Sequence, residues 1–392
     1  MKKPFNHIVL LSFLFISFCL KGNVGNNDYF KLADKTLSVV YQLYSAPVDT
    51  FLLNETYPFN PEHIATYTVS QDKVTKQRVA YLWPSSGMLS GVAAMLEVSG
   101  DKKYKQLLDN RILPGLNQYF DAKRQPNCYQ SYINTEPKSD RFYDDNVWLV
   151  IDFTDLFLTT GDRNYLKQAE LVWKFVISGW DEKLNGGIYW CEQKKTSKNT
   201  CSNAPSVVAA AKLFQATKNK EYLNWSEKIY TWTRLNLQDT LDYLYFDNIN
   251  LEGKTDKRKF AYNAGQMLQG AAILYKLTND KSYLVDARNI AQNAIPYFTK
   301  EIIKDNDVYR VYSKGTGWFY TVMARGYFEL YEIDKNPQYL KSLKSTLDYL
   351  KTYAGTDEGL FYSDWTAGKT NKYKWLLDQA CIIELAARLS AY

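Results

Sequence analysis

Histidine is nearly absent from this sequence, with only His7 and His63 in 392 residues. His7 lies in a short leader described below, so a single histidine remains for chemistry in the rest of the chain. This scarcity excludes a histidine-rich metal site, and any Ser–His–Asp triad would have to use His63. We therefore expect no metal and no other cofactor, and we assign proton transfer to carboxylates or tyrosines.

Cysteine is scarce as well, and no two of the five cysteines stand in the CxxC spacing typical of zinc sites. Cys191 and Cys201 flank the polar segment CEQKKTSKNTC and form a candidate disulfide in an oxidising compartment. Closing a loop of this size would stabilise the fold by about 3 kcal/mol. Two free thiols are the alternative interpretation.

Long apolar runs are missing except for residues 8–20, which are too few to span a bilayer comfortably. This run follows two lysines and is typical of a secretory signal. We expect residues 1–22 to form a signal peptide and residues 26–392 to form one domain, exported to the periplasm or the outer cell surface. Cys19 is a candidate lipid-attachment site, which is the only membrane anchor that we expect.

A large excess of charge is also lacking. The whole chain carries 48 basic and 42 acidic residues, and removing the three lysines of the leader lowers the net charge from +6 to +3. Such a balance provides no long-range attraction to nucleic acid, which we do not expect as a partner. The densest basic stretch, residues 254–259 (KTDKRK), is interpreted as a solvated loop.

The sequence does contain a repeat. A short signature, TGDRNYL at residues 160–166, recurs with variations, and its tyrosines stand 56 to 61 residues apart at Tyr104, Tyr165, Tyr222, Tyr283 and Tyr339. Each copy follows a segment rich in apolar and small residues and precedes an amphipathic one. Because an Asp or Asn in the signature can cap the second segment, each copy predicts a tight turn between two helices.

The repeat predicts two sets of six helices. The set rich in small and apolar residues is expected inside, near 86–98, 145–159, 204–217, 262–278, 317–332 and 376–390. The amphipathic set is expected outside, near 28–45, 102–120, 163–178, 220–236, 281–298 and 337–353. The opening and closing helices lack neighbours along the chain and would pair if the chain closed into a ring. We therefore predict an all-α fold, an (α/α)6 barrel of six helical hairpins, with an open solenoid as the alternative.

The connections between these helices differ in length. All of the long ones run from an outer helix back to an inner one, so they gather at one end of the barrel, where the inner helices begin. They are rich in aromatic residues, among them Trp83, Trp190 and Trp365. Because flat aromatic faces suit the apolar faces of sugar rings, this end is the expected active site and a glycan is the expected substrate.

Asp144 and Asp145 stand out at this end. One Asp at the start of a helix is explained by capping and by the helix dipole. Two in succession are less well explained, because their like charges repel. Hydrolysis of a glycosidic bond requires two carboxyl groups with different pKa values. Spacing alone leaves the structural and the catalytic interpretations open.

These residues resemble glycoside hydrolase family 76, which contains bacterial endo-α-1,6-mannanases and fungal cell-wall relatives. The segment YDDNVW at 143–148 resembles the family's YDDxxW signature, and GGIYW at 186–190, YNAGQ at 262–266 and Lys-Gly at 314–315 match in order. The resemblance extends over roughly residues 80 to 390. Tyr189 stands where the family often has tryptophan, which affects the interpretation of one sugar subsite.

The resemblance implies a metal-free (α/α)6 enzyme that hydrolyses α-1,6-mannan with retention. It implies Asp144 as the nucleophile and Asp145 as the general acid/base. Together with the loop acids and aromatics, it leads to the residues expected to contact a mannose-containing polysaccharide or oligosaccharide: Tyr143, Trp148, Gly186, Gly187, Tyr189, Trp190, Asp247, Asn263, Gln266 and Trp318.

Other functions fit parts of this pattern. An unsaturated glucuronyl hydrolase uses separated aspartates, and sugar epimerases of this shape depend on several histidines, which this chain lacks. A non-catalytic glycan-binding lipoprotein would share the signal, the aromatics and the helices, but it would have no use for the Asp pair. The resemblance implies an endo-acting glycosidase, and we expect it to work as a monomer.

Overall fold

The structure is a computed structural model that describes residues 24–47, 49–60, 62, 77–368 and 370–392. The predicted signal peptide, the candidate lipid site Cys19 and the lone histidine His63 lie outside these residues. Over the described ranges, no helix has both the length and the apolar character needed to cross a membrane.

The recurring signature is a joint between two antiparallel helices. A residue in the left-handed conformation ends the first helix, and these residues are Gly100, Gly161, Lys218, Asn279 and Lys335. The next residue caps the second helix by accepting a backbone N–H two positions on, as Asp101, Asp162, Asn219, Asp280 and Asn336 do. Because one joint satisfies the ends of both helices, the chain reverses within two residues.

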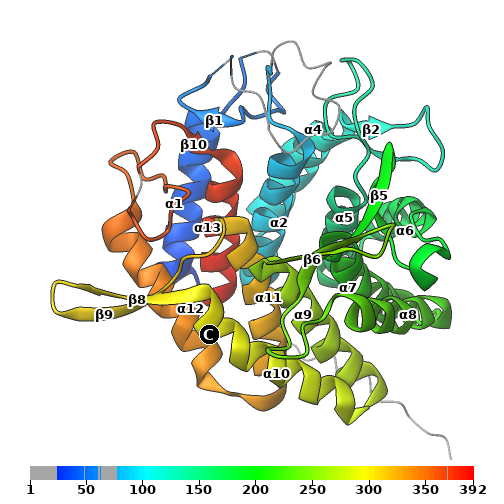
Figure 1. The fold of residues 1–392 in the computed structure, drawn as a ribbon. Coiled ribbons are helices and arrows are strands. Elements are labelled where there is room, and N and C mark those ends of the chain that lie inside the picture. Colours follow the sequence, from blue (N-terminus) through cyan, green and yellow to red (C-terminus); the bar gives the residue numbers. More distant parts are fainter. Residues whose placement is uncertain (1–23, 48, 61, 63–76, 369) are drawn as a thin grey trace, which may run out of the picture.

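The helices form two concentric sets (Figure 1). The inner helices are α2 (Leu82–Ser99), α5 (Tyr143–Thr160), α7 (Thr200–Thr217), α9 (Ala261–Thr278), α11 (Gly317–Asp334) and α13 (Leu376–Leu389). The outer helices are α1 (Asp28–Leu43), α3 (Lys102–Leu107) with α4 (Leu113–Asn117), α6 (Arg163–Ser178), α8 (Lys220–Leu237), α10 (Lys281–Phe298) and α12 (Pro337–Tyr349). π-helical turns at Leu108–Ile112 and Leu350–Ala354 extend the second and the last outer helices, and short 3-10 turns occur at Val24–Asn26 and Lys183–Asn185.

The ring is closed rather than open. The last inner helix, α13, packs against the first, α2, and α1 packs on α13, which is the pairing expected for a closed ring. At the rim, the Tyr29 hydroxyl on α1 donates to Asp348 on α12 at 2.9 Å, which joins the first and last outer helices. The prediction of an (α/α)6 barrel is therefore confirmed, and the solenoid alternative is wrong.

Ion pairs join neighbouring inner helices at the end opposite the long connections. They link α2 to α13, α5 to α7 and α9 to α11, through Glu97–Arg388 at 2.9 Å, Asp155–Lys212 at 2.6 Å and Lys276–Glu329 at 2.5 Å. Each pair lies between two adjacent helices, so these ion pairs tie three of the contacts between neighbours in the ring.

The long connections carry strands, which the sequence interpretation treated as plain loops. The strands are β1 (Thr56–Tyr57), β2 (Phe120–Asp121), β3 (Cys128–Tyr129), β4 (Tyr189–Cys191), β5 (Lys194–Asn199), β6 (Phe246–Asn250), β7 (Thr255–Lys259), β8 (Thr299–Lys304), β9 (Asp307–Tyr312) and β10 (Lys374–Trp375). β4 to β7 form one antiparallel sheet in sequence order, and β8 and β9 form a hairpin that projects from the ring (Figure 1). β1 pairs with β10, so the two ends of the barrel sequence also meet here.

Candidate active site

A cavity of about 420 Å³ opens where the inner helices begin, beside the sheet of β4 to β7. Its wall contains three acids, nine aromatic residues and a set of polar residues. These are Asp144, Asp145, Asp247; Tyr81, Trp83, Phe142, Trp148, Trp190, Phe260, Tyr262, Trp318, Phe319; and Ser131, Lys194, Thr196, Ser197, Asn199, Cys201, Asn248, Arg258. The cavity therefore combines carboxyl groups with flat apolar faces, which suits a sugar ring.

Asp144 and Asp145 occupy the first turn of α5. The residue in the N-cap position is Phe142, so neither carboxylate is the capping residue that the structural interpretation required. Both side chains remain partly exposed and both line the cavity. The local sequence therefore places two acids at one cavity wall, separated by a single step of the helix.

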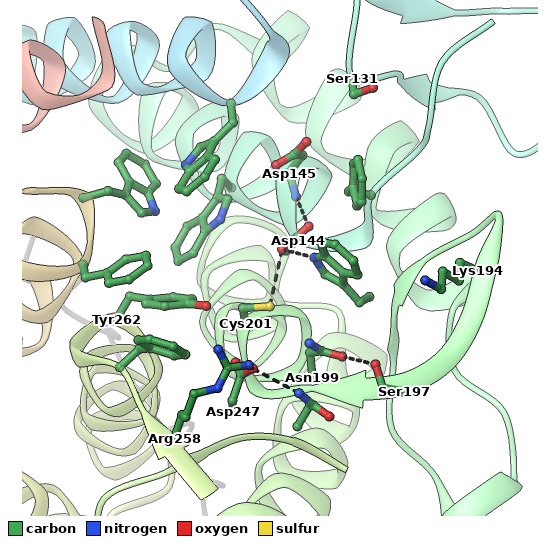
Figure 2. Close-up of a pocket in the computed structure, with 18 of the residues that line it drawn as sticks. Ser131, Asp144, Asp145, Lys194, Ser197, Asn199, Cys201, Asp247, Arg258 and Tyr262 are labelled. Carbon is green, nitrogen blue, oxygen red and sulfur yellow. Dashed lines mark hydrogen bonds and ion pairs between the residues drawn. The ribbon is translucent and has the colours of Figure 1, made fainter. Parts of the chain in front are cut away.

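The Asp144 carboxylate is held on both of its oxygens (Figure 2). Oδ2 accepts hydrogen bonds from the Trp190 indole N–H at 2.9 Å and from the Cys201 thiol at 3.4 Å. Oδ1 accepts the backbone N–H of Asp145 at 2.9 Å. Burial raises the pKa of Asp144 to about 6, and the donors, led by Cys201, limit this rise because they stabilise the charged form.

Asp145 has a different environment. No side chain or backbone group donates to its carboxyl group among the hydrogen bonds of the described residues, whereas Asp144 accepts three. Burial raises the pKa of Asp145 well above its ordinary value, and the negative charges of Asp144 and then Asp140 raise it further. The pKa of Asp145 is therefore raised further than that of Asp144, so the two neighbouring carboxyl groups differ in how readily they give up a proton.

Indole rings form the floor of the cavity. Trp148 and Trp318 meet edge to face with their centroids 5.4 Å apart, and the Arg325 guanidinium lies 5.6 Å and 5.4 Å from them on the far side. On another wall, Tyr262 and Phe319 stack at 4.2 Å. Each pair of rings is held by mutual contact, and the two indoles also by the Arg325 guanidinium, so the rings form a pre-shaped surface for an apolar sugar face.

Asp247 and Arg258 line the cavity from the β6–β7 hairpin (Figure 2). Burial raises the pKa of Asp247, whose Oδ2 accepts from Asn248 at 3.0 Å and lies 3.5 Å from Arg258. The segment 254–259 is exposed or partly exposed to solvent as expected, but its interpretation as a loop is wrong. Most of the segment is strand β7, because it pairs with β6 and because Lys259 is anchored by Asp239 and Asp242, at 2.6 and 2.7 Å.

The structure brings together six of the twelve predicted site residues, namely Asp144, Asp145, Trp148, Trp190, Asp247 and Trp318. The other six are buried and are not among the residues that line the cavity, so their contact with substrate stays a prediction. Tyr143 is buried and stacks on Phe175 at 4.7 Å. Tyr189 is buried and donates its hydroxyl to Asp181 at 2.7 Å.

Gly186 and Gly187 shape the backbone rather than the cavity. Both have positive φ, 127° and 89°, and a Cβ on either would lie within 2.5 Å of a Trp180 or Trp232 ring atom. The buried Lys198 ammonium donates to the Gly186 carbonyl and, at 2.6 Å, to that of Lys183. These glycines therefore let the loop fold tightly around a buried cation.

Asn263 and Gln266 are fully buried on α9. The Gln266 amide donates to Gln269 at 2.9 Å within the helix layer. The residue that reaches the cavity from this motif is Tyr262, which lies one position earlier and faces Cys201 (Figure 2). The sequence analysis chose Asn263 and Gln266 from this motif, whereas the side chain that lines the cavity is that of Tyr262.

The candidate disulfide is not formed, and Cys191 and Cys201 are free thiols. Cys201 points at Asp144, whereas the Cys191 thiol lies 3.6 Å from the Gln193 side chain. The segment between them is held instead by strand pairing, since Cys191 lies opposite Lys194 across the β4–β5 turn. The alternative of two free thiols is the correct one.

Several cavity residues were not identified from the sequence. Ser197 and Asn199 belong to β5 and Asn248 to β6, in polar segments that carry no apolar alternation. The turn sequence Leu251–Lys254 (LEGK) between β6 and β7 is the one local signal of a hairpin there. Cys201 was assigned to a disulfide, so its proximity to Asp144 was missed.

Comparisons with known proteins agree with this geometry. The sequence profile of glycosyl hydrolase family 76 matches residues 59–328, which is more than half of the chain. A solved family 76 glycoside hydrolase (mannosidase) of Bacteroides thetaiotaomicron VPI-5482 superposes with a TM-score of 0.83 at 29% identity, covering 93% of this chain and 98% of that one. An inactive variant of the α-1,6-mannanase of Salegentibacter sp. HEL1_6, in complex with α-1,6-mannotriose, superposes with a TM-score of 0.74 at 21% identity, covering 93% and 100%.

Sequence relatives extend the comparison to fungi. A putative mannan endo-1,6-α-mannosidase of Schizosaccharomyces pombe is 24% identical over 234 residues, or 57% of this chain and 52% of the relative. The chain therefore spans about half the length of the curated relatives that it matches. The profile match and the superposition confirm the family that the sequence motifs resembled, and the chain belongs to glycosyl hydrolase family 76.

Proposed function

We propose that this chain is an endo-acting α-1,6-mannanase that cleaves by double displacement. The observation that carries the proposal is the asymmetric pair of acids in one sugar-sized cavity, with Asp144 held by three donors and Asp145 by none among the described residues. A nucleophile must be ionised and a general acid must be protonated, and this asymmetry favours both states at one pH.

In the first step, an oxygen of Asp144 attacks the anomeric carbon of a mannose residue while the glycosidic C–O bond breaks. Asp145 gives its proton to the departing oxygen, and a mannosyl–Asp144 ester forms. In the second step, Asp145 takes a proton from water, whose oxygen attacks the same carbon and releases Asp144. Two inversions retain the configuration at that carbon.

Relatives support the substrate. The Salegentibacter protein is named an α-1,6-mannanase, and replacing two consecutive aspartates by asparagine makes it an inactive variant that holds α-1,6-mannotriose. The fission yeast relative is named for endo cleavage of 1,6-linked mannan. The leader of residues 1–22 supports export, so we place the enzyme outside the cytoplasm, acting as a monomer on mannose-containing polysaccharide or oligosaccharide.

The test is the hydrolysis of linear α-1,6-mannan, with products sized by mass spectrometry. The wild type should release a ladder of oligosaccharides early in the reaction, and Asp144→Asn and Asp145→Asn should each lower the rate by about a thousand-fold or more. Glu182→Gln, a change of an exposed loop acid, is the matched control and should leave the rate unchanged.

Three results would contradict the proposal. Near-normal turnover by either asparagine variant would overturn the assigned roles. Release of monosaccharide alone would overturn endo action. Binding of mannan without any product after long incubation would favour the glycan-binding alternative, and cleavage only of uronate oligosaccharides would favour the glucuronyl hydrolase.

A further inference from the structure

Two side chains outside helix α5 donate to the same oxygen of Asp144. They are the indole N–H of Trp190 at 2.9 Å and the thiol of Cys201 at 3.4 Å. We infer that Trp190 and Cys201 are positioning residues that together hold Asp144 oriented and ionised as the attacking carboxylate. This inference rests on the proposed function for its consequence in catalysis, but the state of Asp144 can be measured separately.

The two donors are fixed by different parts of the fold. Trp190 belongs to β4, and its ring lies against Phe142, the residue that precedes α5, with centroids 4.9 Å apart. Cys201 belongs to the first turn of α7 and is 5% exposed. Asp144 is therefore clamped between a strand and a neighbouring helix, and its orientation depends on neither donor alone.

Both donors remain donors over the working pH range. The indole N–H does not ionise, and burial followed by the charge of Asp144 raises the pKa of the Cys201 thiol well above its ordinary value. The Tyr262 hydroxyl also faces this thiol from α9 (Figure 2). A thiol that stays protonated beside a carboxylate acts as a hydrogen-bond donor, rather than as a nucleophile or a disulfide partner.

Donors to the charged form lower the pKa of a carboxyl group, so removing either should raise the pKa of Asp144. Trp190→Phe keeps an aromatic face and removes only the N–H, which separates positioning from stacking on sugar. Cys201→Ala removes the thiol, and Cys201→Ser returns a hydroxyl donor. Cys381→Ala, which removes a buried thiol of α13 outside the cavity wall, is the matched control.

The first measurement is a carbon-13 NMR titration of protein labelled at aspartate carboxyl groups, in which the signal lost in Asp144→Asn identifies Asp144. We expect its midpoint to rise by about one pH unit in Trp190→Phe and about half a unit in Cys201→Ala, because a thiol is the weaker donor. The acid limb of kcat/KM on mannan should move by the same amounts, costing about tenfold and threefold in rate at pH 5. Cys201→Ser should restore at least half of the Cys201→Ala shift.

An unshifted midpoint in both Trp190→Phe and Cys201→Ala, with the fold intact by circular dichroism, would overturn the inference. So would an equal shift in Cys381→Ala, because the effect would then be general. Failure of the wild type to cleave mannan would overturn the proposed function, and the NMR titration would still decide whether the two donors hold Asp144 ionised.

Discussion

Arg325 offers a test of how the barrel supports the cavity floor. Its side chain is 4% exposed, and its Nε and Nη2 donate at 2.7 and 2.8 Å to the two oxygens of Glu384, which is fully buried on α13. The same guanidinium lies beneath Trp148 and Trp318, which line the cavity. Replacing Arg325 by Met keeps most of the side-chain volume and removes the charge.

The expected loss of stability comes from the Glu384 carboxylate, which stays buried when Arg325 is replaced. Burial raises the pKa of Glu384, but Arg325 and Arg388 outweigh that effect and keep the pKa below its ordinary value. Breaking a buried pair by removing one partner costs about 3–5 kcal/mol. Arg388 donates to Glu384 at 2.8 Å and is left in place by this change, so we expect the lower end of this range, about 3 kcal/mol.

The assay is urea unfolding at pH 8 and at pH 5. Asp152, whose pKa is raised to about 7 by burial, also loses the nearby positive charge that limits this rise. At low pH both Glu384 and Asp152 can take up a proton, which removes the unpaired buried charge. The loss in free energy of unfolding should therefore be larger at pH 8 than at pH 5. A control, Arg310→Met, breaks a pair with the exposed Glu301 and should cost about 1 kcal/mol or less. A cost below about 1 kcal/mol for Arg325→Met, or one that grows as the pH falls, would refute this reasoning.

Two further predictions concern activity and helix packing. In the proposed mechanism Asp144 must be ionised and Asp145 protonated, so kcat/KM on mannan should be bell-shaped in pH. With a pKa of about 6 for Asp144, kcat/KM should fall about fivefold between pH 6 and pH 5 and about ninefold between pH 5 and pH 4. If the acid limb of the initial-rate profile had its midpoint below pH 4.5, the assignment of this limb to Asp144 would be contradicted. Gly265→Ala should destabilise the fold by about 3 kcal/mol in urea unfolding, since its Cβ would lie 2.4 Å from the Met323 Cα on α11. The control is Gly161→Ala, at φ +75° with no atom within 4 Å of the added Cβ, which should cost only about 1 kcal/mol. Equal losses of stability in the two variants would show that close helix packing does not explain the effect at Gly265.

The helical ring could be predicted from the sequence because its joints are encoded locally. A positive-φ residue, an Asp or Asn cap and a tyrosine occur within five consecutive residues, as Gly161, Asp162 and Tyr165 show. The tyrosine then links neighbouring hairpins, since the Tyr165 hydroxyl donates at 2.7 Å to Asp109 of the preceding hairpin. Capping involves only a few neighbouring residues and the repeat is visible in the sequence itself, so both can be recognised without knowledge of the fold.

The cavity wall could not be predicted to the same extent because it is built by contacts far apart in the chain. Ser197 in β5 lies opposite Asn250 in β6, although helices α7 and α8 separate these two strands along the chain. The two halves of the sheet are therefore joined by a long-range pairing. Arg258 reaches the cavity only because this sheet brings β7 beside it. Polar strands of this kind lack the alternation that marks a half-buried strand, so their sequences are indistinguishable from those of loops.

The proposed catalytic pair depends on both the local sequence and the fold. Adjacent positions on a helix point about 100° apart, which is enough for Asp144 to meet β4 and α7 while Asp145 meets none of these donors. The sequence therefore predicts which two acids to choose, but their division of labour depends on Trp190 and Cys201, residues that lie 45 or more positions away along the chain. The proposed reaction requires two chemically identical side chains to differ in protonation, and the contacts that distinguish them come from the loop sheet and a neighbouring inner helix rather than from the motif alone.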